Sequence, residues 1–542
     1  MRRGWWPKAP LVIVSAAILY FIGAGRVSLW DRDEAWYAQT SRQMVQSGDW
    51  VVPRFLDSPR YAKPIFIYWC QAASMKLFGP TALAARIPSA VAMLGTIALL
   101  AVVLKRAVGP QRASFTALIF GSSAMVIASA KMCLTDSVML FFLTAAQLAV
   151  FSIYRNRNER IAPWLLWIAL GGAILTKGPF PLVVMLATLV ALVAFDVGRN
   201  WKSAAAWRDA IRWWWGLRPL LGLMIIIAMV APWLIMLYRR EPAALRAMLG
   251  EPFRHLTSDQ DSQWVYPGYY PLTIWLTFFP WSLLLPAALI YGWKRRKQPM
   301  ARFALATILG NWIFVELMIT KLPHYMLPSF SSLAFLTAGV LTVWIRRSIV
   351  PWQMKVGVLV WSIVVPVLAL LPWIPKSHFQ IPLAGAIAFT AFGVLYELTV
   401  TILWYLRRPA AAARVMGFGM MLVIAILFGL YFPQANFLRI PEQAGAKLRE
   451  LKAADAVMTG FSEPSLAFYQ GGTIRPRPDD FLLAQSPADW PNWIVLTSDI
   501  YQSLPPDRRE RLDQIASYRG FNYNIPMRPV TVIIARKRSG SN

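Results

Sequence analysis

The sequence has few acidic residues and few cysteines, and it lacks an internal repeat. Its 542 residues include 26 Asp+Glu against 55 Lys+Arg, which gives a formal net charge of +29. Two cysteines, Cys70 and Cys133, cannot form a disulfide framework, and the sequence does not decide whether they pair with each other. The absence of a repeat disfavours the inverted-repeat plan of many transporters.

Long apolar runs dominate what is present, because 57% of the residues are hydrophobic. Runs of about 20 residues match the thickness of a bilayer, so we predict a polytopic α-helical membrane protein with about thirteen spans. The predicted spans cover residues 9–27, 82–104, 113–131, 134–153, 162–176, 179–196, 219–238, 270–292, 302–320, 323–345, 351–372, 381–406 and 415–432.

The positive charge is distributed in a way that indicates a membrane protein and not a partner of nucleic acid. Short basic clusters precede the first span and then fall in alternate loops, for example Lys105-Arg106 and Arg346-Arg347. By the positive-inside rule these loops and the N-terminus are cytoplasmic. No small-x-small cleavage site precedes Asp31, so we interpret the first apolar run as a span and not as a signal peptide.

The chain divides into a membrane part, residues 1–432, and a tail, residues 433–542. We expect the tail to be a small soluble α/β domain on the outer side, with strands at 456–461, 493–497 and 530–535. Helices are predicted at 441–453, 463–469 and 506–517. The tail shows no metal-ligand cluster, glycine-rich phosphate loop or nucleophile elbow.

The first outer loop, residues 28–81, is too polar to span a bilayer and too apolar for an ordinary loop. Asp33-Glu34 begin an amphipathic helix that ends at Gly48, and a second helix begins at Lys63-Pro64 and ends at Gly79. Between two spans, such helices are expected to lie in the membrane interface.

Several acids lie where spans meet the outer side. In the stretch Asp31-Arg32-Asp33-Glu34, one interpretation is a helix cap, with Asp31 as N-cap and Glu34 three residues on. The other is that Asp33 or Glu34 supplies a carboxylate that accepts a proton from a hydroxyl nucleophile, and both can hold at once. Asp136, at the start of a span, either caps that span or acts as a second acid that tunes Asp33, positions a substrate or holds a metal. Polar groups at membrane depth tend to line cavities, and these acids therefore predict one outward-facing site.

Cations and aromatic residues are predicted on the same side. Arg54 and Lys63 in the first loop, with Lys177 and Lys321 at two later turns, either extend to the solvated interface or hold a phosphate. His324 and Tyr325 follow Lys321 directly, and Tyr37 lies in the first loop helix. His255, in the 239–269 loop, lies near acids and is a weaker candidate for a ligand. The predicted set is Asp33, Glu34, Asp136, Lys63, Arg54, Lys177, Lys321, Tyr37, Tyr325, His324 and His255.

Motifs in a fixed order resemble those of integral-membrane C-type (GT-C) glycosyltransferases, including protein mannosyltransferase-like enzymes and the aminoarabinose transferases of lipid A. Single motifs are weak, but their order is specific and covers nearly the whole chain. The motifs are Asp-Glu-Ala-Trp-Tyr-Ala at 33–38, Ser-Gly-Asp-Trp-Val at 47–51, Lys-Pro at 63–64, Leu-Thr-Asp-Ser at 134–137, Leu-Thr-Lys-Gly-Pro at 175–179, Phe-Pro-Trp at 279–281, Lys-Leu-Pro-His-Tyr-Met-Leu-Pro at 321–328 and the stretch 460–469.

The resemblance implies a reaction in which a polyprenyl-phosphate sugar donates its sugar, with inversion, to an acceptor outside the bacterial cytoplasmic membrane. The acceptor class it implies is lipid A, a polysaccharide, another glycolipid or a protein. It implies that Asp33 is the catalytic base or positions the acceptor, that Lys63 contacts the donor phosphate, and that Asp136 and Tyr325 belong to the site. Inversion needs only one well-placed carboxylate, because no covalent sugar intermediate forms.

The chain departs from the aminoarabinose transferases where those enzymes bind a metal. Their glutamate ligand before the lysine is replaced by Ala62, and His255 does not clearly match their loop histidine, because Pro252 competes for that position. The sequence therefore predicts no certain cofactor, and a divalent metal stays open.

Two other functions were weighed against the glycosyltransferase. A transporter or flippase of polyprenyl-linked lipids would need functional charges at mid-membrane and repeated broken helices. A non-catalytic scaffold whose tail binds a partner would work normally without Asp33. The predicted partners are a polyprenyl-phosphate sugar, an acceptor and membrane lipids, with no nucleic acid.

Overall fold

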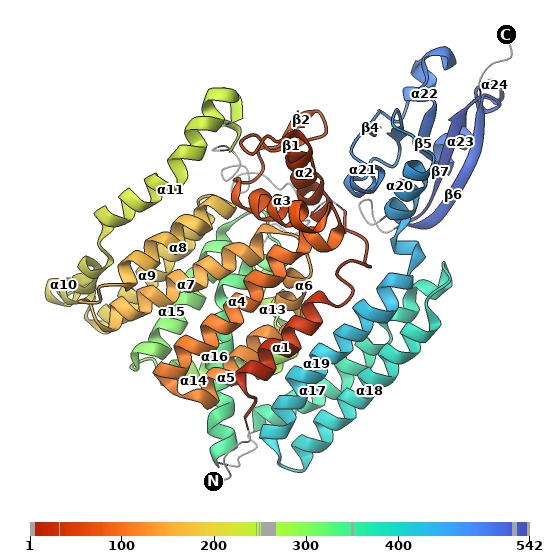
Figure 1. Cartoon of the computed structure of the whole chain (residues 1–542). Helices are drawn as coiled ribbons and strands as arrows, with labels where there is room; N and C mark the ends of the chain where they lie inside the picture. The colour runs from red at the N-terminus through yellow and green to blue at the C-terminus, as the bar shows by residue number, and fades with distance from the viewer. Residues whose placement is uncertain are drawn as a thin grey trace.

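A computed structural model places a bundle of long helices beside a small mixed domain (Figure 1). It describes residues 6–538 except 32, 245, 249, 251–266, 348–351 and 523–527. The N-terminal end lies at the bottom of the bundle in Figure 1, and the small domain lies above its upper right edge.

The bundle consists of apolar helices joined mostly by short connections. Their buried faces form two large clusters, one around α1, α4, α5 and α16 and the other between α7, α8 and α9. The bundle helices are α1 (Ala9–Phe21), α4 (Ala82–Val108), α5 (Pro110–Gly121), α6 (Ala124–Ala130), α7 (Thr135–Arg155), α8 (Ala162–Lys177), α9 (Phe180–Val197), α10 (Ala204–Ile211), α11 (Pro219–Arg240), α13 (Tyr269–Thr277), α14 (Leu285–Lys294), α15 (Pro299–Leu317), α16 (Leu327–Arg347), α17 (Trp352–Ala369), α18 (Leu383–Tyr405) and α19 (Pro409–Ile426).

The described residues contain nine helices long and apolar enough to cross a membrane, or eleven if each of two bent pairs counts as one span. The bent pairs are α5 with α6 and α13 with the helix that follows it, with bends of 66° and 119°. Two shorter apolar helices, α1 and α8, coincide with the remaining predicted spans. Each predicted span thus contains an apolar helix or bent pair, and the polytopic helical fold class is confirmed.

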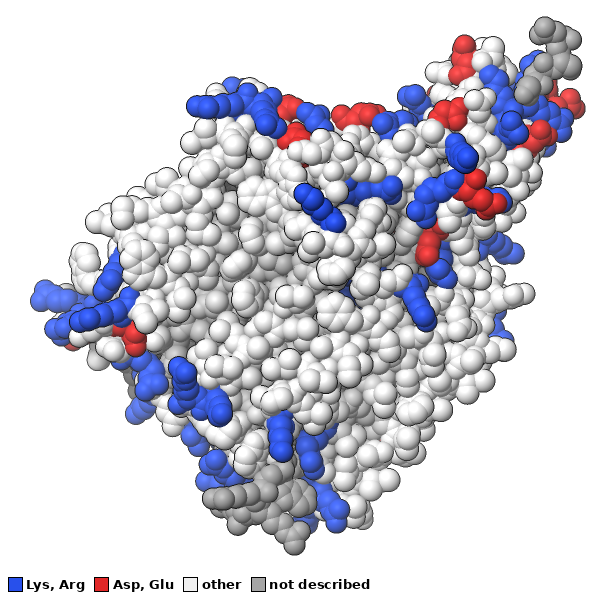
Figure 2. Space-filling model, in the orientation of Figure 1, with Lys and Arg blue, Asp and Glu red and all other residues white. Residues whose placement is uncertain are grey.

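The charged side chains divide the surface into two polar edges and an uncharged belt (Figure 2). Lys and Arg dominate the lower edge, whereas the upper edge, around the first loop and the small domain, carries both signs. This division is typical of a multi-pass membrane protein, whose uncharged belt faces lipid.

The first outer loop contains two helices that lie over the upper ends of the bundle helices (Figure 1). α2 (Glu34–Ser47) and α3 (Phe66–Phe78) pack against each other and are joined through a short hairpin, β1 (Arg54–Phe55) and β2 (Ser58–Pro59). Both predicted loop helices are therefore present, although the second begins a few residues later than Lys63-Pro64 indicated. Gly48 ends α2 in the left-handed conformation that glycine adopts without strain.

The polar side of α2 differs from the expectation for a helix lying at the membrane surface. Gln39, a polar residue of this amphipathic helix, is only 1% exposed. Arg42 donates a hydrogen bond to the carbonyl of Phe468, 2.5 Å away, in the small domain. The polar side of α2 is covered because the small domain docks on it, a contact between residues more than 400 positions apart.

The tail forms one mixed five-stranded sheet with strand order β4-β3-β5-β7-β6. β3 is parallel to both β4 and β5, whereas β5–β7 and β7–β6 are antiparallel. Its elements are α20 (Ile440–Glu450), β3 (Val457–Thr459), α21 (Pro464–Gln470), β4 (Arg475–Pro476), α22 (Phe481–Ala484), β5 (Trp493–Thr497), α23 (Ser498–Ser503), α24 (Pro506–Arg509), β6 (Leu512–Asn522) and β7 (Arg528–Lys537).

The predicted helix over 506–517 is wrong beyond its first turn. Helix α24 ends at Arg509, and the chain continues as the long strand β6. The charged run from Arg508 to Arg511 is typical of a helix, but pairing with β7 along ten residues satisfies the backbone of 512–522 instead. A shift in register between Gln514 and Ala516 also breaks the strict alternation that identifies a strand in sequence.

The small domain, which we call the outer domain, is held to the first loop by buried polar contacts. The carboxylate of Asp31 accepts hydrogen bonds from the backbone N–H and the hydroxyl of Ser465, at 2.7 and 2.6 Å. The Tyr469 hydroxyl accepts one from the backbone of Leu29 at 2.9 Å. Leu56, from the hairpin, is buried within the hydrophobic core of the outer domain. Asp31 therefore caps the first turn of α21 and not that of α2.

We predict that Ser465→Ala loosens this contact. The buried Asp31 carboxylate would lose the hydrogen bond from the Ser465 hydroxyl, which costs about 1.5–3 kcal/mol for a hydrogen bond to a charged group. The expected result is faster proteolytic release of the outer domain, measured by limited digestion. Ser462→Ala, an exposed position on the same loop, is the matched control. Equal digestion rates for Ser465→Ala and wild type would contradict the prediction.

Candidate functional site

An ion-pair cluster forms where α7 begins and α8 ends. The buried Asp136 carboxylate lies 2.5 Å from the ammonium of Lys177 and 3.9 Å from Nε2 of His324. Lys63, from the first loop, acts electrostatically on both Asp136 and His324. An anionic residue at a helix N-terminus and a cation at a C-terminus are each favoured by the helix dipole. The structure thus brings together Asp136, Lys177, His324 and Lys63.

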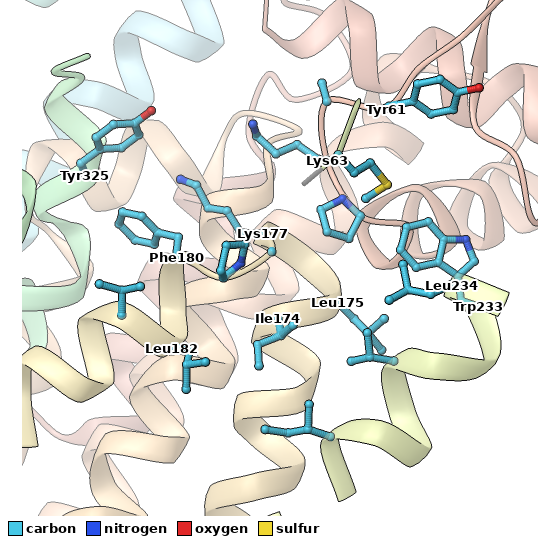
Figure 3. A pocket seen from close by; sticks show the side chains of 18 of the residues that line it. Tyr61, Lys63, Ile174, Leu175, Lys177, Phe180, Leu182, Trp233, Leu234 and Tyr325 are labelled. Atoms are coloured by element: carbon cyan, nitrogen blue, oxygen red, sulfur yellow. The ribbon is translucent and has the colours of Figure 1, made fainter. Parts of the chain in front are cut away.

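A cavity of about 440 Å³ opens beside this cluster (Figure 3). The side chains of Lys63 and Lys177 extend in the same direction at one end of the pocket, toward Tyr325. The ammonium of Lys177 lies 5.0 Å from the centre of the Tyr325 ring. The rest of the wall is mainly apolar and includes Ile174, Leu175, Phe180, Leu182, Val230, Trp233, Leu234, Phe314 and Met318. An apolar cavity with two cations at one end suits an amphiphile with an anionic head.

Tyr37 connects the exposed carboxylate of the first loop to this cluster. Its buried ring stacks on Tyr68, with ring centres 5.7 Å apart, and the guanidinium of Arg60 lies over it at 5.5 Å. Burial raises the pKa of Tyr37, and both Asp33 and Asp136 are near enough to add to that rise. Asp33 itself is exposed at the N-cap of α2. Asp33 and Asp136 therefore both lie near one buried phenol.

Glu34, the second acid of the Asp-Glu pair, has a different environment from its neighbour. It is fully buried, and the guanidinium of Arg86 donates to both of its carboxylate oxygens, at 2.8 and 2.6 Å. The backbone N–H groups of Trp30 and Cys133 donate to the same carboxylate. These contacts occupy Glu34, so its geometry favours a structural function, and a catalytic function stays an untested prediction.

Two of the predicted phosphate contacts have protein partners of their own. Arg54 pairs with Glu241 at 2.7 Å, and Glu241 also accepts a hydrogen bond from the Tyr61 hydroxyl. The buried ammonium of Lys321 donates to the carbonyl of Met318. Neither Arg54 nor Lys321 lines the pocket, whereas Lys63 and Lys177 do.

A metal centre gains no support from the part of the chain that the structure describes. That part contains no group of three His, Cys, Asp or Glu residues placed to hold a metal ion. Ala62, which lines the pocket next to Lys63, has no ligand atom in its side chain. His255 lies outside the described residues, so its predicted place in the site is untested. The described pocket residues thus do not fit a metal.

Sequence reasoning missed Glu241 and Arg86. Glu241 follows the predicted span 219–238 and carries no motif. Arg86 had a usable signal, because it is the only charged residue within the predicted span 82–104, and a charge inside a span tends to be paired or functional. The apolar residues of the pocket wall could not be recognised from the sequence, because they do not differ from the other apolar residues of the spans.

Residues 8–247 match the family described as dolichyl-phosphate-mannose-protein mannosyltransferase. That segment contains Asp33, Lys63, Asp136 and Lys177, whereas Lys321, His324 and Tyr325 lie beyond it.

Curated relatives and solved structures extend the comparison. The undecaprenyl phosphate-alpha-4-amino-4-deoxy-L-arabinose arabinosyl transferase 1 of Pseudomonas fluorescens is 30% identical over 353 residues, and the alignment spans 63% of this chain and 60% of that protein. A relative of similar description from Aeromonas salmonicida is 31% identical over 329 residues, covering 59% of this chain and 58% of that protein. The chain therefore matches about three fifths of the length of these relatives.

The fold is shared over nearly the full length. The crystal structure of ArnT from Cupriavidus metallidurans bound to undecaprenyl phosphate matches with a TM-score of 0.74 and 20% identity, covering 97% of each chain. The oligosaccharyltransferase of Archaeoglobus fulgidus matches with a TM-score of 0.54 and 10% identity, covering 92% of this chain and 70% of that one. The predicted GT-C fold, with a small C-terminal α/β region, is confirmed.

Proposed function

We propose that the chain is an inverting glycosyltransferase that moves a sugar from a polyprenyl-phosphate donor to an acceptor on the outer face of the bacterial cytoplasmic membrane. The observation that carries the proposal is the pocket, which joins an apolar wall to Lys63 and Lys177. The names of the relatives and the undecaprenyl phosphate bound to ArnT support the same donor class.

The donor would bind with its isoprenoid chain against the apolar wall and its phosphate at the two lysines. Lys63 and Lys177 would then offset the charge that builds on the departing phosphate as the sugar leaves. Lys177 already pairs with Asp136 at 2.5 Å, so Asp136 would hold that ammonium at the phosphate end of the pocket. Tyr325 would close the same end.

The acceptor would approach from the water-exposed side, where Asp33 lies. A carboxylate there can take the proton of an attacking hydroxyl, and a single such base suffices for inversion. The acceptor class we propose is lipid A, a polysaccharide, another glycolipid or a protein. The outer-face assignment rests on the basic lower edge, which the positive-inside rule places in the cytoplasm.

The test is transfer of radiolabelled sugar from a panel of polyprenyl-phosphate sugars by the purified full chain. We expect transfer from at least one donor, with release of polyprenyl phosphate. If no donor reacts and the protein instead moves polyprenyl-linked lipid across vesicles, the flippase alternative replaces the proposal. If the protein does neither, the scaffold alternative gains support and the pocket has another ligand.

Lys63→Gln is predicted to weaken donor binding. A hydrogen bond to a charged phosphate contributes about 1.5–3 kcal/mol, so the KM for the donor should rise roughly ten- to hundredfold. Binding of the labelled donor, measured apart from transfer, checks this. Lys76→Gln removes the same charge from an exposed position on α3 and should leave the KM unchanged. A normal KM in Lys63→Gln would exclude Lys63 as a phosphate contact.

A further inference from the structure

A second cavity lies at the opposite end of the bundle from the pocket. Helix α7 connects the two, because Asp136 lies in its first turn and Arg155 is its last residue. The cavity has a volume of about 250 Å³ and lies among the last turns of α4, α7 and α14, the first turns of α5 and α15, and the middle of α16. The polar residues of its wall are Arg112, Arg155, Tyr291, Arg295 and Gln298.

Arg112 is built into this cavity. Its guanidinium lies 3.7 Å from the centre of the Phe335 ring, and Nη2 donates to the Phe335 carbonyl at 3.3 Å. Its Nε is buried and has no hydrogen-bond partner. Gly339 makes room for it, because a Cβ there would lie 2.6 Å from Nη2. The guanidinium is thus fixed in place with one donor left unused.

The wall of this cavity carries positive charge and, in the described part of the chain, no acidic side chain; Glu159 lines the neighbouring cavity with Arg155. Among the described residues, no ion pair involves Arg112, Arg155 or Arg295. Tyr291 lies between two of them, with its ring 5.7 Å from the guanidinium of Arg112 and 5.0 Å from that of Arg295. Three arginines gathered without a carboxylate repel one another, and a bound anion would remove that repulsion. Arginine is the side chain best suited to phosphate.

The cavity adjoins apolar space. A neighbouring cavity of about 320 Å³ has Ala107, Phe151, Arg155 and Met300 in common with it. Its other walls are apolar on one side, with Val103, Leu104 and Leu148, and polar on the other, with Ser152, Asn156 and Glu159. An anion bound at the arginines would therefore lie next to a groove whose apolar side fits hydrocarbon.

From this geometry we propose that the cavity binds the phosphate headgroup of an anionic phospholipid from the leaflet opposite the pocket, with an acyl chain in the adjoining groove. Basic pockets between membrane helices on the cytoplasmic side bind such headgroups. The shared chemistry is phosphate, and a free phosphate ion is the other source. The apolar groove favours the lipid, because a free ion would leave it unfilled.

The experiment is native mass spectrometry of the full chain in detergent, with phosphatidylglycerol and phosphatidylcholine of the same acyl chains. We expect wild type to retain phosphatidylglycerol preferentially. Replacing Arg112 or Arg295 by Gln should lower that retention about fivefold for each arginine. Gly339→Ala keeps every charge but displaces Arg112, and it should cause a similar loss.

The control is Arg106→Gln, which removes one positive charge from an exposed position at the same end of α4. It should retain phosphatidylglycerol as wild type does. Equal losses in Arg106→Gln and Arg112→Gln would overturn the proposal, because overall charge would then explain binding. A second result would also overturn it. If inorganic phosphate raises the melting temperature of the protein as much as phosphatidylglycerol does, the cavity binds a free ion and not a lipid. Circular dichroism establishes that each variant is folded.

Discussion

Asp33→Asn is expected to abolish most sugar transfer while leaving donor binding intact. The substitution keeps the shape of the side chain but removes its ability to accept a proton. A positioned general base contributes about 10²–10⁴-fold to the rate, and the loss in kcat should fall in that range. Asp33 is exposed and does not line the donor pocket, so the KM for the donor should stay near that of wild type.

The measurement is the initial rate with labelled donor at saturating acceptor, beside equilibrium binding of the donor. Asp507→Asn, an exposed acid in the outer domain, controls for the loss of one negative charge. Equal rates in Asp33→Asn and wild type would remove Asp33 as the base. Asp136, which also acts electrostatically on Tyr37, would then be the next candidate for the base. A variant that loses donor binding as well would point to a positioning function.

The second large effect is expected on stability, from Arg86→Met. This change leaves the fully buried Glu34 carboxylate without its ion partner. Removing one member of a buried pair costs about 3–5 kcal/mol, because an uncompensated charge remains in the interior. Arg86 also donates to the carbonyls of Ala24, Val27 and Ser28, so the turn before the first loop should loosen too.

Thermal unfolding in detergent measures this effect, and the double variant Glu34→Leu/Arg86→Met is its control. The double variant removes both charges and should be less destabilised than the sum of the two single variants. Strict additivity would show that the pair is not coupled. Glu34→Gln separates structure from catalysis, because transfer per folded molecule should stay near normal if Glu34 is structural. A loss of transfer in a stable Glu34→Gln protein would restore its predicted catalytic function.

Features written locally in the sequence could be predicted. A run of about 20 apolar residues predicts each span. The helical periodicity of its apolar residues and the glycine at position 48 predict α2. The grouping of Asp136, Lys177 and Lys63 followed from assigning every loop to one side of the membrane. That assignment needs only the basic clusters, so residues of distant segments could be placed on one face without a structure.

Features that depend on distant partners could not be predicted. Nothing near Asp31 indicates that Ser465 will take its carboxylate, and nothing near Gln39 indicates that a domain will cover it. The strand β6 is likewise decided by its partner β7, which follows it. The pairing of Arg54 with Glu241 joins two loops 187 residues apart. In each case a contact with a distant segment decides the structure, whereas the local sequence pattern alone predicts a cap, an exposed side chain, a helix or a phosphate contact.

The contact between Asp31 and Ser465 also has a consequence for biosynthesis. The first loop leaves the ribosome early, but the residues that complete its packing are made 434 positions later. At about 5–20 residues per second, the loop waits on the order of half a minute for its partner. A chain that stops before the outer domain would carry Asp33 and Lys63 on a first loop whose helix α2 has lost the contacts with that domain. The site can therefore be assembled only after translation is complete, and prematurely ended chains would be inactive.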